Sequence, residues 1–335
     1  MRIVYLLESG ELFGGAKIIM MHAEGLARRG HRVTVVSPRP APDWFPLRWA
    51  RFDEVPFESS EELRNADVCV ATFFRTVRPA LNRARGPVFH LCQGYEGEIT
   101  FYRDLWPEIA EIYRLPTRKL AVSQTLSQHL DSLGFGPATD VGQAFDATLF
   151  SPGPPRAPSD PPVALVVGPL EIDFKGIEIA LAGIREYRRR GGGLKVRRVS
   201  YFPAGDAEKQ FGVADEFHHR LDPERMPFAY RASDLFIGPS RHAEGFGLPS
   251  LEALACGLPA LLSDVPGQKE IGGESAWYFP DGDPIALADA LPGLLTEEAR
   301  RRARKLGPER AARWDTALVV ERLERAFAAA TGGTN

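Results

Sequence analysis

Short apolar runs alternate with longer amphipathic segments along this chain. The run RIVYLL at the N-terminus is typical of a buried strand, and AKIIMMHAEGLARRG places apolar residues at helical spacing until Gly30. The run HRVTVVS predicts the next strand, and further strands are predicted at 68–72, 88–92 and 120–123. Alternation of strands with helices predicts an α/β fold with a mostly parallel, doubly wound sheet.

A proline-rich stretch then interrupts this alternation. PGPPRAPSDPP, residues 152–162, holds six prolines in eleven residues and is predicted to be a stiff linker, because proline donates no backbone hydrogen bond. A second series follows it. Its predicted elements are strands at 163–168, 195–201, 235–237 and 259–262, helices at 176–190 and from about Pro249, and a helical stretch at 297–330.

The chain is long enough for two domains of this kind. Two parallel-sheet domains joined by a stiff linker predict a cleft between them, and ligands of such sheets bind outside the carboxyl ends of the strands. Candidate site residues are therefore sought after the strands. The expected parts are a Rossmann-like domain over 1–151, the linker over 152–162, a second Rossmann-like domain over 163–313, and a terminal helix over 314–335.

Charge and cysteine content narrow the function. The net charge of −3, from 41 basic and 44 acidic residues, argues against a general nucleic-acid surface. The three cysteines, Cys69, Cys92 and Cys256, lack metal-ligand spacing and are predicted to be buried and reduced. No signal-peptide pattern and no membrane span is recognised. We expect a cytoplasmic protein, with peripheral membrane contact left open.

Two loops that follow predicted strands could bind a phosphate. In ESGELFGGAK, Gly14 and Gly15 lie where a helix begins, so backbone N–H groups could approach an anion; a plain tight turn is the alternative. Their spacing is not that of the dinucleotide fingerprint. In GPLEIDFKGIEIAL, Lys175 precedes a helix and could reach a phosphate, although a solvated lysine would look the same.

The segment SRHAEGFGLPSLEALACGLPALLSD combines a strand end, a glycine bend and a helix start. Pro249 suits the first helical turn and Gly257 the position past the helix end. Glu244 and Glu252 could accept hydrogen bonds from the hydroxyls of a sugar or ribose. Taken singly, Glu244 could be a solvated loop acid and Glu252 a helix-dipole residue, but the whole constellation is more specific.

EGFGLPSLEALACGLP resembles the E-x7-E signature of family 4 retaining glycosyltransferases, which have the GT-B fold. The resemblance continues in GGAKIIMMHAEGLARRGHRVTVVS, in VGPLEIDFKGIEIAL and in DVPGQKEI, and so covers most of the chain. RWDTALVVERLERAF resembles the final helix that often crosses back to the N-terminal domain. The motif QGYE is weakly similar to a bacterial rhamnosyltransferase-like subset.

The resemblance implies transfer of a hexosyl or deoxyhexosyl group from a nucleotide-diphosphate sugar to a glycan, lipid-linked or small-molecule acceptor, without a metal or other cofactor. Glu252 would hold the ribose and Glu244 the donor sugar, while Lys175 would neutralise the leaving diphosphate. The remaining donor contacts would come from Gly14, Gly15, Phe246, Gly247 and Leu248. Polysaccharide biosynthesis is the expected setting, and the oligomeric state is left open.

The chain departs from the family pattern at the phosphate clamp. Pro169 stands where the family usually has arginine, and the spacing to Lys175 is one residue longer. Arg241 or Arg75 is expected to compensate. Where the family often has a histidine, this chain has Gln93, which we expect to be a cleft contact. We expect His90 to be buried in its strand instead.

Three further motifs receive structural interpretations. In DGD, Asp283 is predicted to cap a helix that starts at Pro284 rather than to bind a metal. His218 and His219 are predicted to lie in a surface loop, since no partner ligands are spaced for a metal. The aromatic stretch QGYEGEITFYRDLWPEI could line an acceptor site or pack against helices, and packing is favoured.

Two other functions remain compatible with the scaffold. One is a nucleotide-sugar epimerase, for which no additional acid/base set is recognised. The other is a catalytically silent nucleotide-sugar-binding protein, which the proline at position 169 would favour. An oxidoreductase is a weaker option because the glycine spacing of the first loop does not fit.

Overall fold

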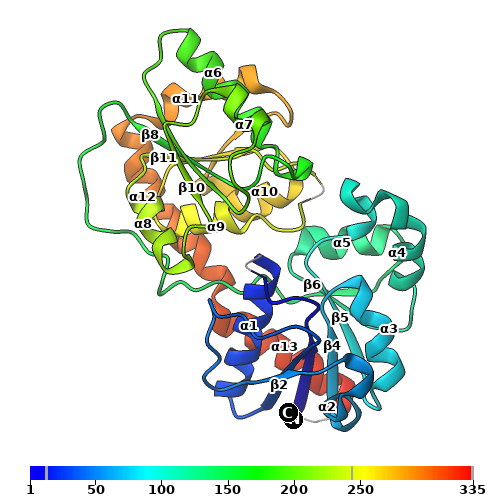
Figure 1. The fold of residues 1–335 in the computed structure, drawn as a ribbon. Helices are drawn as coiled ribbons and strands as arrows, with labels where there is room; N and C mark the ends of the chain where they lie inside the picture. Colours follow the sequence, from blue (N-terminus) through cyan, green and yellow to red (C-terminus); the bar gives the residue numbers. More distant parts are fainter. Residues whose placement is uncertain (12–13, 243, 333–335) are drawn as a thin grey trace. The chain divides into compact units, whose positions relative to one another are not determined.

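The computed structural model describes residues 1–11, 14–242 and 244–332, which form two compact units. The first unit comprises Met1–Phe145 and Trp314–Asn335, and the second comprises Asp146–Arg313. No secondary structure is assigned between 151 and 162, the proline-rich stretch. Figure 1 shows that each unit has a twisted sheet with helices on both faces.

In the described part of the first unit, a seven-stranded parallel sheet has the order β3-β2-β1-β4-β5-β6-β7. Its strands are β1 Arg2–Leu6, β2 Arg32–Ser37, β3 Arg51–Glu54, β4 Val68–Ala71, β5 Val88–Cys92, β6 Arg118–Ala121 and β7 Ala138–Asp140. Its helices are α1 Gly14–Arg28, α2 Glu61–Asn65, α3 Phe74–Arg83, α4 Trp106–Tyr113, α5 Gln124–Ser132 and α13 Thr316–Thr331, with 3-10 turns at Phe57–Ser59, Glu96–Glu98 and Thr100–Leu105.

The described part of the second unit repeats the plan with a six-stranded parallel sheet, β10-β9-β8-β11-β12-β13. The strands are β8 Val163–Val167, β9 Lys195–Ser200, β10 Glu216–His219, β11 Leu235–Gly238, β12 Ala260–Ser263 and β13 Trp277–Phe279. The helices are α6 Ile177–Arg189, α7 Asp206–Phe211, α8 Met226–Arg231, α9 Leu248–Ala255, α10 Pro266–Gly272, α11 Pro284–Leu294 and α12 Glu297–Ala311, with 3-10 turns at Asp173–Lys175, Pro223–Arg225, Gly273–Ser275 and Ala312–Trp314.

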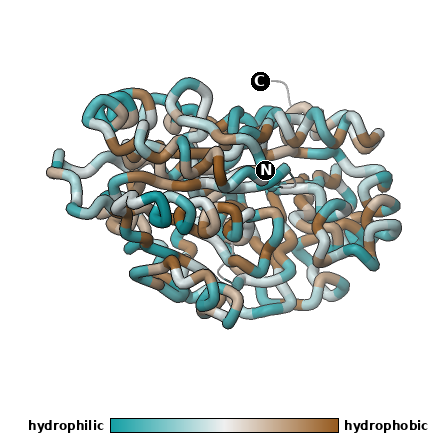
Figure 2. Tube along the Cα trace, turned by 90° about the horizontal axis from the view of Figure 1, so that it is seen from above, coloured by the Kyte–Doolittle hydropathy of each residue, from teal (hydrophilic) through white to brown (hydrophobic). Residues whose placement is uncertain are grey.

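Helices cover both faces of each sheet, which explains the continuous apolar runs in the central strands. Strands β4, β5, β11 and β12 are buried at every position. Along the chain trace, apolar segments alternate with hydrophilic ones (Figure 2). The predicted α/β class with two Rossmann-like parallel sheets is confirmed.

The C-terminal stretch is two helices rather than one. Helix α12 ends at Ala311, a 3-10 turn follows, and Asp315 caps α13 by accepting a hydrogen bond from the backbone of Ala317. Helix α13 packs against α1, and a Cβ atom placed on Gly25 would lie only 2.5 Å from Val320 Cγ2. The absence of a side chain at Gly25 therefore lets the two helices approach closely.

Two predictions about local structure have different outcomes. Asp283 caps α11, because its Oδ1 accepts hydrogen bonds from the backbones of Ile285 and Ala286, as predicted. The expected loop at His218 and His219 is wrong, because both residues belong to strand β10. That strand lies at an edge of the sheet, where polar side chains can remain partly exposed to solvent.

Further findings concern the cysteines, membrane-spanning helices and groups of potential metal ligands. All three cysteines are buried and unpaired, as predicted. In the described residues, no helix combines the length and apolar character that crossing a membrane requires. Within the same residues, no group of three or more His, Cys, Asp or Glu side chains is arranged to hold a metal ion.

Candidate active site

In the second unit, the strand order reverses between β8 and β11, which lie side by side in the sheet. Ligands of open parallel sheets bind outside the carboxyl ends of the strands at this kind of switch point. The loop after β8 carries Lys175, and the loop after β11 carries Glu244. The topology alone therefore brings two of the predicted residues to one place.

Glycines shape the loop that follows β8. Gly176 has a φ of +60°, and a Cβ atom there would lie 2.1 Å from the carbonyl oxygen of Pro239. Only glycine fits this position without strain. The backbone N–H of Arg241 also donates to the carbonyl of Phe174 at 2.8 Å. The two loops are thus held together through their backbones.

Lys175 donates a hydrogen bond from its ammonium group to Glu244 Oε1. The Lys175 side chain is 23% exposed and the Glu244 side chain only 6%. The second carboxylate oxygen, Glu244 Oε2, is buried and has no hydrogen-bond partner among the residues that the structure describes. An unsatisfied buried acceptor is costly, so this oxygen is suited to receive a hydroxyl donor from a ligand.

A buried arginine supports the loop that carries Lys175. Arg198 is fully buried in β9 and donates to the carbonyls of Val166 and Gly168, both at 2.8 Å. Glu208 neutralises it through an ion pair of 2.5 Å. Sequence reasoning missed this residue. Arg198 lies in the run KVRRVS beside two other basic residues, Lys195 and Arg197, so the pattern does not single it out.

Glu252 lies on α9 with 8% of its surface exposed. The hydroxyl of Tyr230, a fully buried residue of α8, donates to Glu252 Oε2 at 2.8 Å. Burial, and then the Glu252 charge, raise the pKa of Tyr230 well above its usual value, so the hydroxyl stays protonated and can donate. Tyr230 was not predicted from the sequence, because its partner is 22 positions away.

The glycine bend before α9 is tightly turned. Gly247 has φ −89° and ψ 74°, and the N–H of Leu248 donates to the carbonyl of Phe246 at 3.2 Å, as in an inverse γ-turn. A Cβ atom on Gly247 would lie 2.4 Å from Gln268 Nε2. Gln268 is buried, and its Oε1 has no partner within the described part of the chain. Gln268 is therefore another acceptor beside the bend.

The two arginines expected to compensate for Pro169 each pair with a carboxylate. Arg241 lies beside Gly176 and pairs with Glu178 at 3.7 Å, with 46% of its side chain exposed. Arg75, in the first unit, pairs with Glu8 at 3.3 Å. Both side chains are at least 46% exposed, so either ion pair can open at little cost in free energy.

In the first unit, Gly14 and Gly15 begin helix α1. Gln93 follows β5, and its Nε2 donates to the carbonyl of Gly15 at 3.2 Å. Three predicted residues of this unit are thus brought together. His90 is fully buried, as predicted, and burial lowers its pKa to about 3, so it is neutral near pH 7.

Sequence reasoning missed a second carboxyl group in this unit. Glu96 accepts a hydrogen bond from the hydroxyl of Tyr113, and burial raises the pKa of Glu96 to about 7. Glu96 follows the carboxyl end of β5, at the same sheet edge as Gln93. Near neutral pH the Glu96 carboxyl group is therefore partly protonated and partly ionised, a property common at functional sites.

The aromatic stretch mostly packs, as favoured from the sequence. Tyr95 packs edge to face against Tyr113, and Tyr102 contacts Phe74 in the same way. The prediction is wrong for Phe101, which is 86% exposed. The 3-10 turn Thr100–Leu105 directs it outward while its neighbour Tyr102 faces the unit.

Residues 161–297 match the family described as "Glycosyl transferases group 1". This match lies within the second unit and covers less than half of the chain, and it supports the predicted glycosyltransferase class for that segment. The chain is 33% identical over 122 residues to the phosphatidyl-myo-inositol mannosyltransferase of Mycobacterium leprae, covering 35% of this chain and 33% of that protein. It is 31% identical over 175 residues to the D-inositol 3-phosphate glycosyltransferase of Xylanimonas cellulosilytica, covering 49% and 42%. The chain thus spans less than half the length of these two relatives.

Solved structures resemble the chain over almost its whole length. Sucrose-phosphate synthase from Thermosynechococcus elongatus has a TM-score of 0.77 at 18% identity, with 98% of each chain covered. HepE of Anabaena, solved with UDP-glucose, has a TM-score of 0.77 at 15% identity, with 98% of this chain and 99% of that chain covered. The fold is GT-B, as predicted.

Proposed function

We propose that this chain is a retaining glycosyltransferase that moves a sugar from a nucleotide-diphosphate sugar to an acceptor hydroxyl. The observation that carries the proposal is the contact between Lys175 and the nearly buried Glu244 at the switch point of the second sheet. The contact leaves Glu244 Oε2 without a partner among the described residues. A sugar hydroxyl is a chemically suitable donor for that oxygen.

The second unit would bind the donor. Glu252, with one oxygen already fixed by Tyr230, would accept hydrogen bonds from the ribose. The bend formed by Phe246, Gly247 and Leu248 would lie along the sugar and the diphosphate, with Gln268 as an added acceptor. Lys175 would turn from Glu244 toward the diphosphate when the donor binds. The solved complex of HepE with UDP-glucose supports a donor of this chemical class.

We propose the following reaction for this arrangement. The bond between the sugar C1 and the phosphate oxygen breaks, and a bond from the acceptor oxygen to C1 forms on the same face. The acceptor proton passes to the released diphosphate, so no side-chain base is needed. Lys175 would stabilise the charge that develops on the leaving group, which is usually the largest catalytic contribution of an enzyme site.

The first unit would supply the acceptor side. Gly14, Gly15 and Gln93 would contribute contacts near the diphosphate, and Glu96 is a candidate to orient an acceptor hydroxyl. Carbohydrate and lipid-linked acceptors both fit this proposal, as the names of the mannosyltransferase and inositol-phosphate relatives suggest. Cytoplasmic location, peripheral membrane contact, independence of metal and membership of a rhamnosyltransferase-like subset remain predictions.

A donor screen tests the function. The midpoint of thermal unfolding should rise with one of the UDP, GDP, dTDP or ADP sugars, because a ligand that binds the native state stabilises it by mass action. That donor should be hydrolysed slowly or transferred, and Glu244→Ala should abolish turnover. Tight nucleotide binding without turnover for any donor and acceptor would instead support a silent binding protein, which the proline at position 169 favours.

A further inference from the structure

The second unit has a further pocket at the amino ends of its strands, opposite the candidate active site at their carboxyl ends. The pocket has a volume of about 500 Å³. Ser233 and Asp234 precede β11 there, and Leu258 and Pro259 precede β12. The pocket therefore lies at the amino ends of strands whose carboxyl ends carry the candidate active site. No part of the glycosyl-transfer proposal uses it.

Its lining is apolar with an unusual number of arginines. The apolar part includes Phe228, whose surface is 66% exposed, and prolines of the 152–162 stretch. The charged part holds five arginines against two carboxylates. The charged lining residues are Arg156, Arg231, Arg300, Arg301, Arg304, Asp234 and Glu297.

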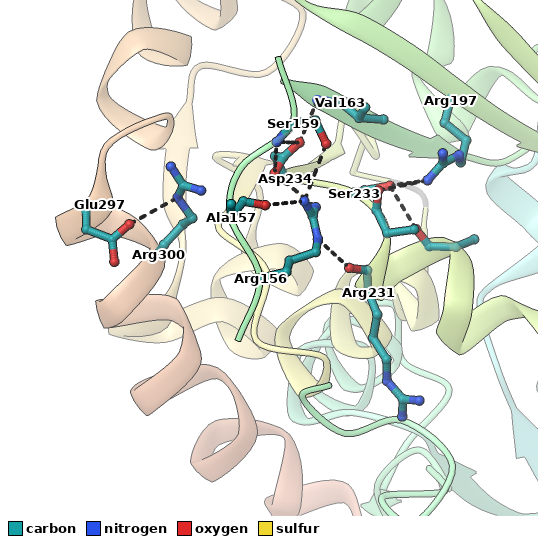
Figure 3. A network of polar contacts seen from close by, with 12 residues as sticks. Arg156, Ala157, Ser159, Val163, Arg197, Arg231, Ser233, Asp234, Glu297 and Arg300 are labelled. Atoms are coloured by element: carbon teal, nitrogen blue, oxygen red, sulfur yellow. Dashed lines mark hydrogen bonds and ion pairs between the residues drawn. The ribbon is translucent and has the colours of Figure 1, made fainter. Parts of the chain in front are cut away.

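Asp234, one of the two carboxylates in the lining, would repel a bound anion only weakly. Asp234 has 4% of its side chain exposed and pairs with Arg156 at 2.9 Å. Its Oδ2 also accepts a hydrogen bond from the backbone N–H of Val163 at 2.9 Å. Figure 3 shows the Arg156 guanidinium turned toward Asp234 and the Arg231 side chain pointing away from it. Asp234 is thus engaged inside the wall and is neutralised there.

Arg231, of α8, donates to the carbonyls of Leu149 and Ser151. The other three arginines come from one helix, α12. Arg304 donates from Nη2 to the carbonyl of Gly153 at 2.7 Å, which leaves further donors of its guanidinium for a ligand. Arg300 pairs with Glu297 at 3.7 Å, a distance longer than a normal hydrogen bond (Figure 3). Arg301 is exposed and lines the same pocket. Arginines bind phosphate through paired N–H groups, so three on one helix suit a phosphate.

We propose that this pocket binds a phosphomonoester that carries an apolar or aromatic group. Arg300, Arg301 and Arg304 hold the phosphate, and Phe228 packs against the apolar part. The phosphate belongs either to a soluble metabolite or to a lipid headgroup. The pocket volume is large enough for a ligand with both parts.

The first test uses phenyl phosphate and inorganic phosphate as probes, with calorimetry on the full chain at about 0.15 M ionic strength. Phenyl phosphate should bind more tightly than inorganic phosphate, and Phe228→Ala should remove the difference. Arg301→Gln with Arg304→Gln should weaken phenyl phosphate binding by roughly 100-fold, since each charged hydrogen bond contributes about tenfold. Glu297→Gln should tighten binding, because it releases Arg300.

A matched control separates the pocket from general charge. Arg189→Gln with Lys209→Gln removes the same charge at exposed positions on other helices of the unit, which do not line the pocket. This variant should change binding by less than about threefold, because distant charges are screened. Arg301→Gln alone, at an exposed position, keeps the test valid if the Arg304 substitution loosens the Gly153 contact. Melting temperatures should show that all variants are folded.

Vesicles of phosphatidylcholine with and without phosphatidic acid then distinguish the two sources. Sedimentation that depends on phosphatidic acid and fails in the arginine variant identifies a lipid headgroup. Binding of phenyl phosphate without such sedimentation identifies a soluble ligand. The proposal is wrong if neither probe binds, if the control loses as much affinity as the arginine variant, or if Lys175→Gln alone abolishes phenyl phosphate binding. Donor-sugar binding should be unchanged in the pocket variants, so this test is independent of the proposed transfer reaction.

Discussion

The ammonium group of Lys175 lies on one oxygen of the Glu244 carboxylate, and both residues come from loops at the switch point of the second sheet. Because the Glu244 side chain is only 6% exposed, water can replace this contact only in part. The same lysine is the cation that we assign to the leaving diphosphate. The pair therefore links the stability of the unliganded protein to its catalytic step.

Lys175→Met should destabilise the unit by about 1–3 kcal/mol, because it leaves a buried carboxylate unpaired. Glu244→Gln should cost less, since Lys175 can turn to solvent. In the double variant much of the loss should be recovered, which a double-mutant cycle of denaturant unfolding measures. Additive effects would show that the two side chains do not interact. Turnover should fall by about 10²–10³ in Lys175→Met, as when a charge-stabilising donor is removed.

Tyr230→Phe should lower the affinity for the nucleotide sugar with little change in kcat. The substitution removes the hydrogen bond that fixes Glu252 but adds no charge and leaves no large cavity. The expected loss is about 1–2 kcal/mol, seen mainly in KM. Tyr187→Phe, near the C-terminal end of α6, is the matched control. If both variants raise KM equally, Glu252 is not positioned by Tyr230.

The strands that sequence patterns missed share one physical property. β3, β7, β10 and β13 each lie at an edge of a sheet. Strands β3 and β10 have the same half-exposed burial pattern and no apolar run. Central strands such as β5 are buried on both faces and therefore show a continuous apolar signal. Edge pairing is decided by tertiary contacts that a local pattern does not contain.

Some residues of the candidate site could likewise be recognised in the sequence, and others could not. Glu244, Glu252 and Lys175 could be named as candidates from the sequence, because their segments resemble glycosyltransferase motifs, and their roles stay predictions. Arg198 and Tyr230 could not, because each acts through burial and through partners distant in sequence. The structure also shows that Arg241 already pairs with Glu178, which no spacing predicts.

Gly247→Ala should impair donor binding through Gln268. The added Cβ would lie 2.4 Å from Gln268 Nε2, so the buried amide must move. A combined Gly247→Ala and Gln268→Ala variant should recover stability, because the obstruction is gone, but should not recover donor affinity if Gln268 Oε1 contacts the sugar. Gly293→Ala, in helix α11 with open space around it, should be neutral or slightly stabilising. Full recovery of both properties would remove Gln268 from the site.

The first unit should lose stability in mild acid because of two buried histidines. Burial lowers the pKa of His22 and of His90 to about 3, against an unfolded value near 6.5. Between these values the unfolded chain binds protons that the folded unit excludes, so stability falls as the pH drops from about 6.5 toward 3. At pH 5 each histidine should cost about 2 kcal/mol relative to pH 7. Glu96, whose pKa burial raises from 4.5 to about 7, has the opposite sign and should offset about 2 kcal/mol of that total. Urea unfolding at both pH values measures the difference, which His90→Leu should reduce and His219→Asn, at an exposed edge-strand position, should leave unchanged. An equal pH dependence in all three proteins would mean that His90 is protonated in the folded state.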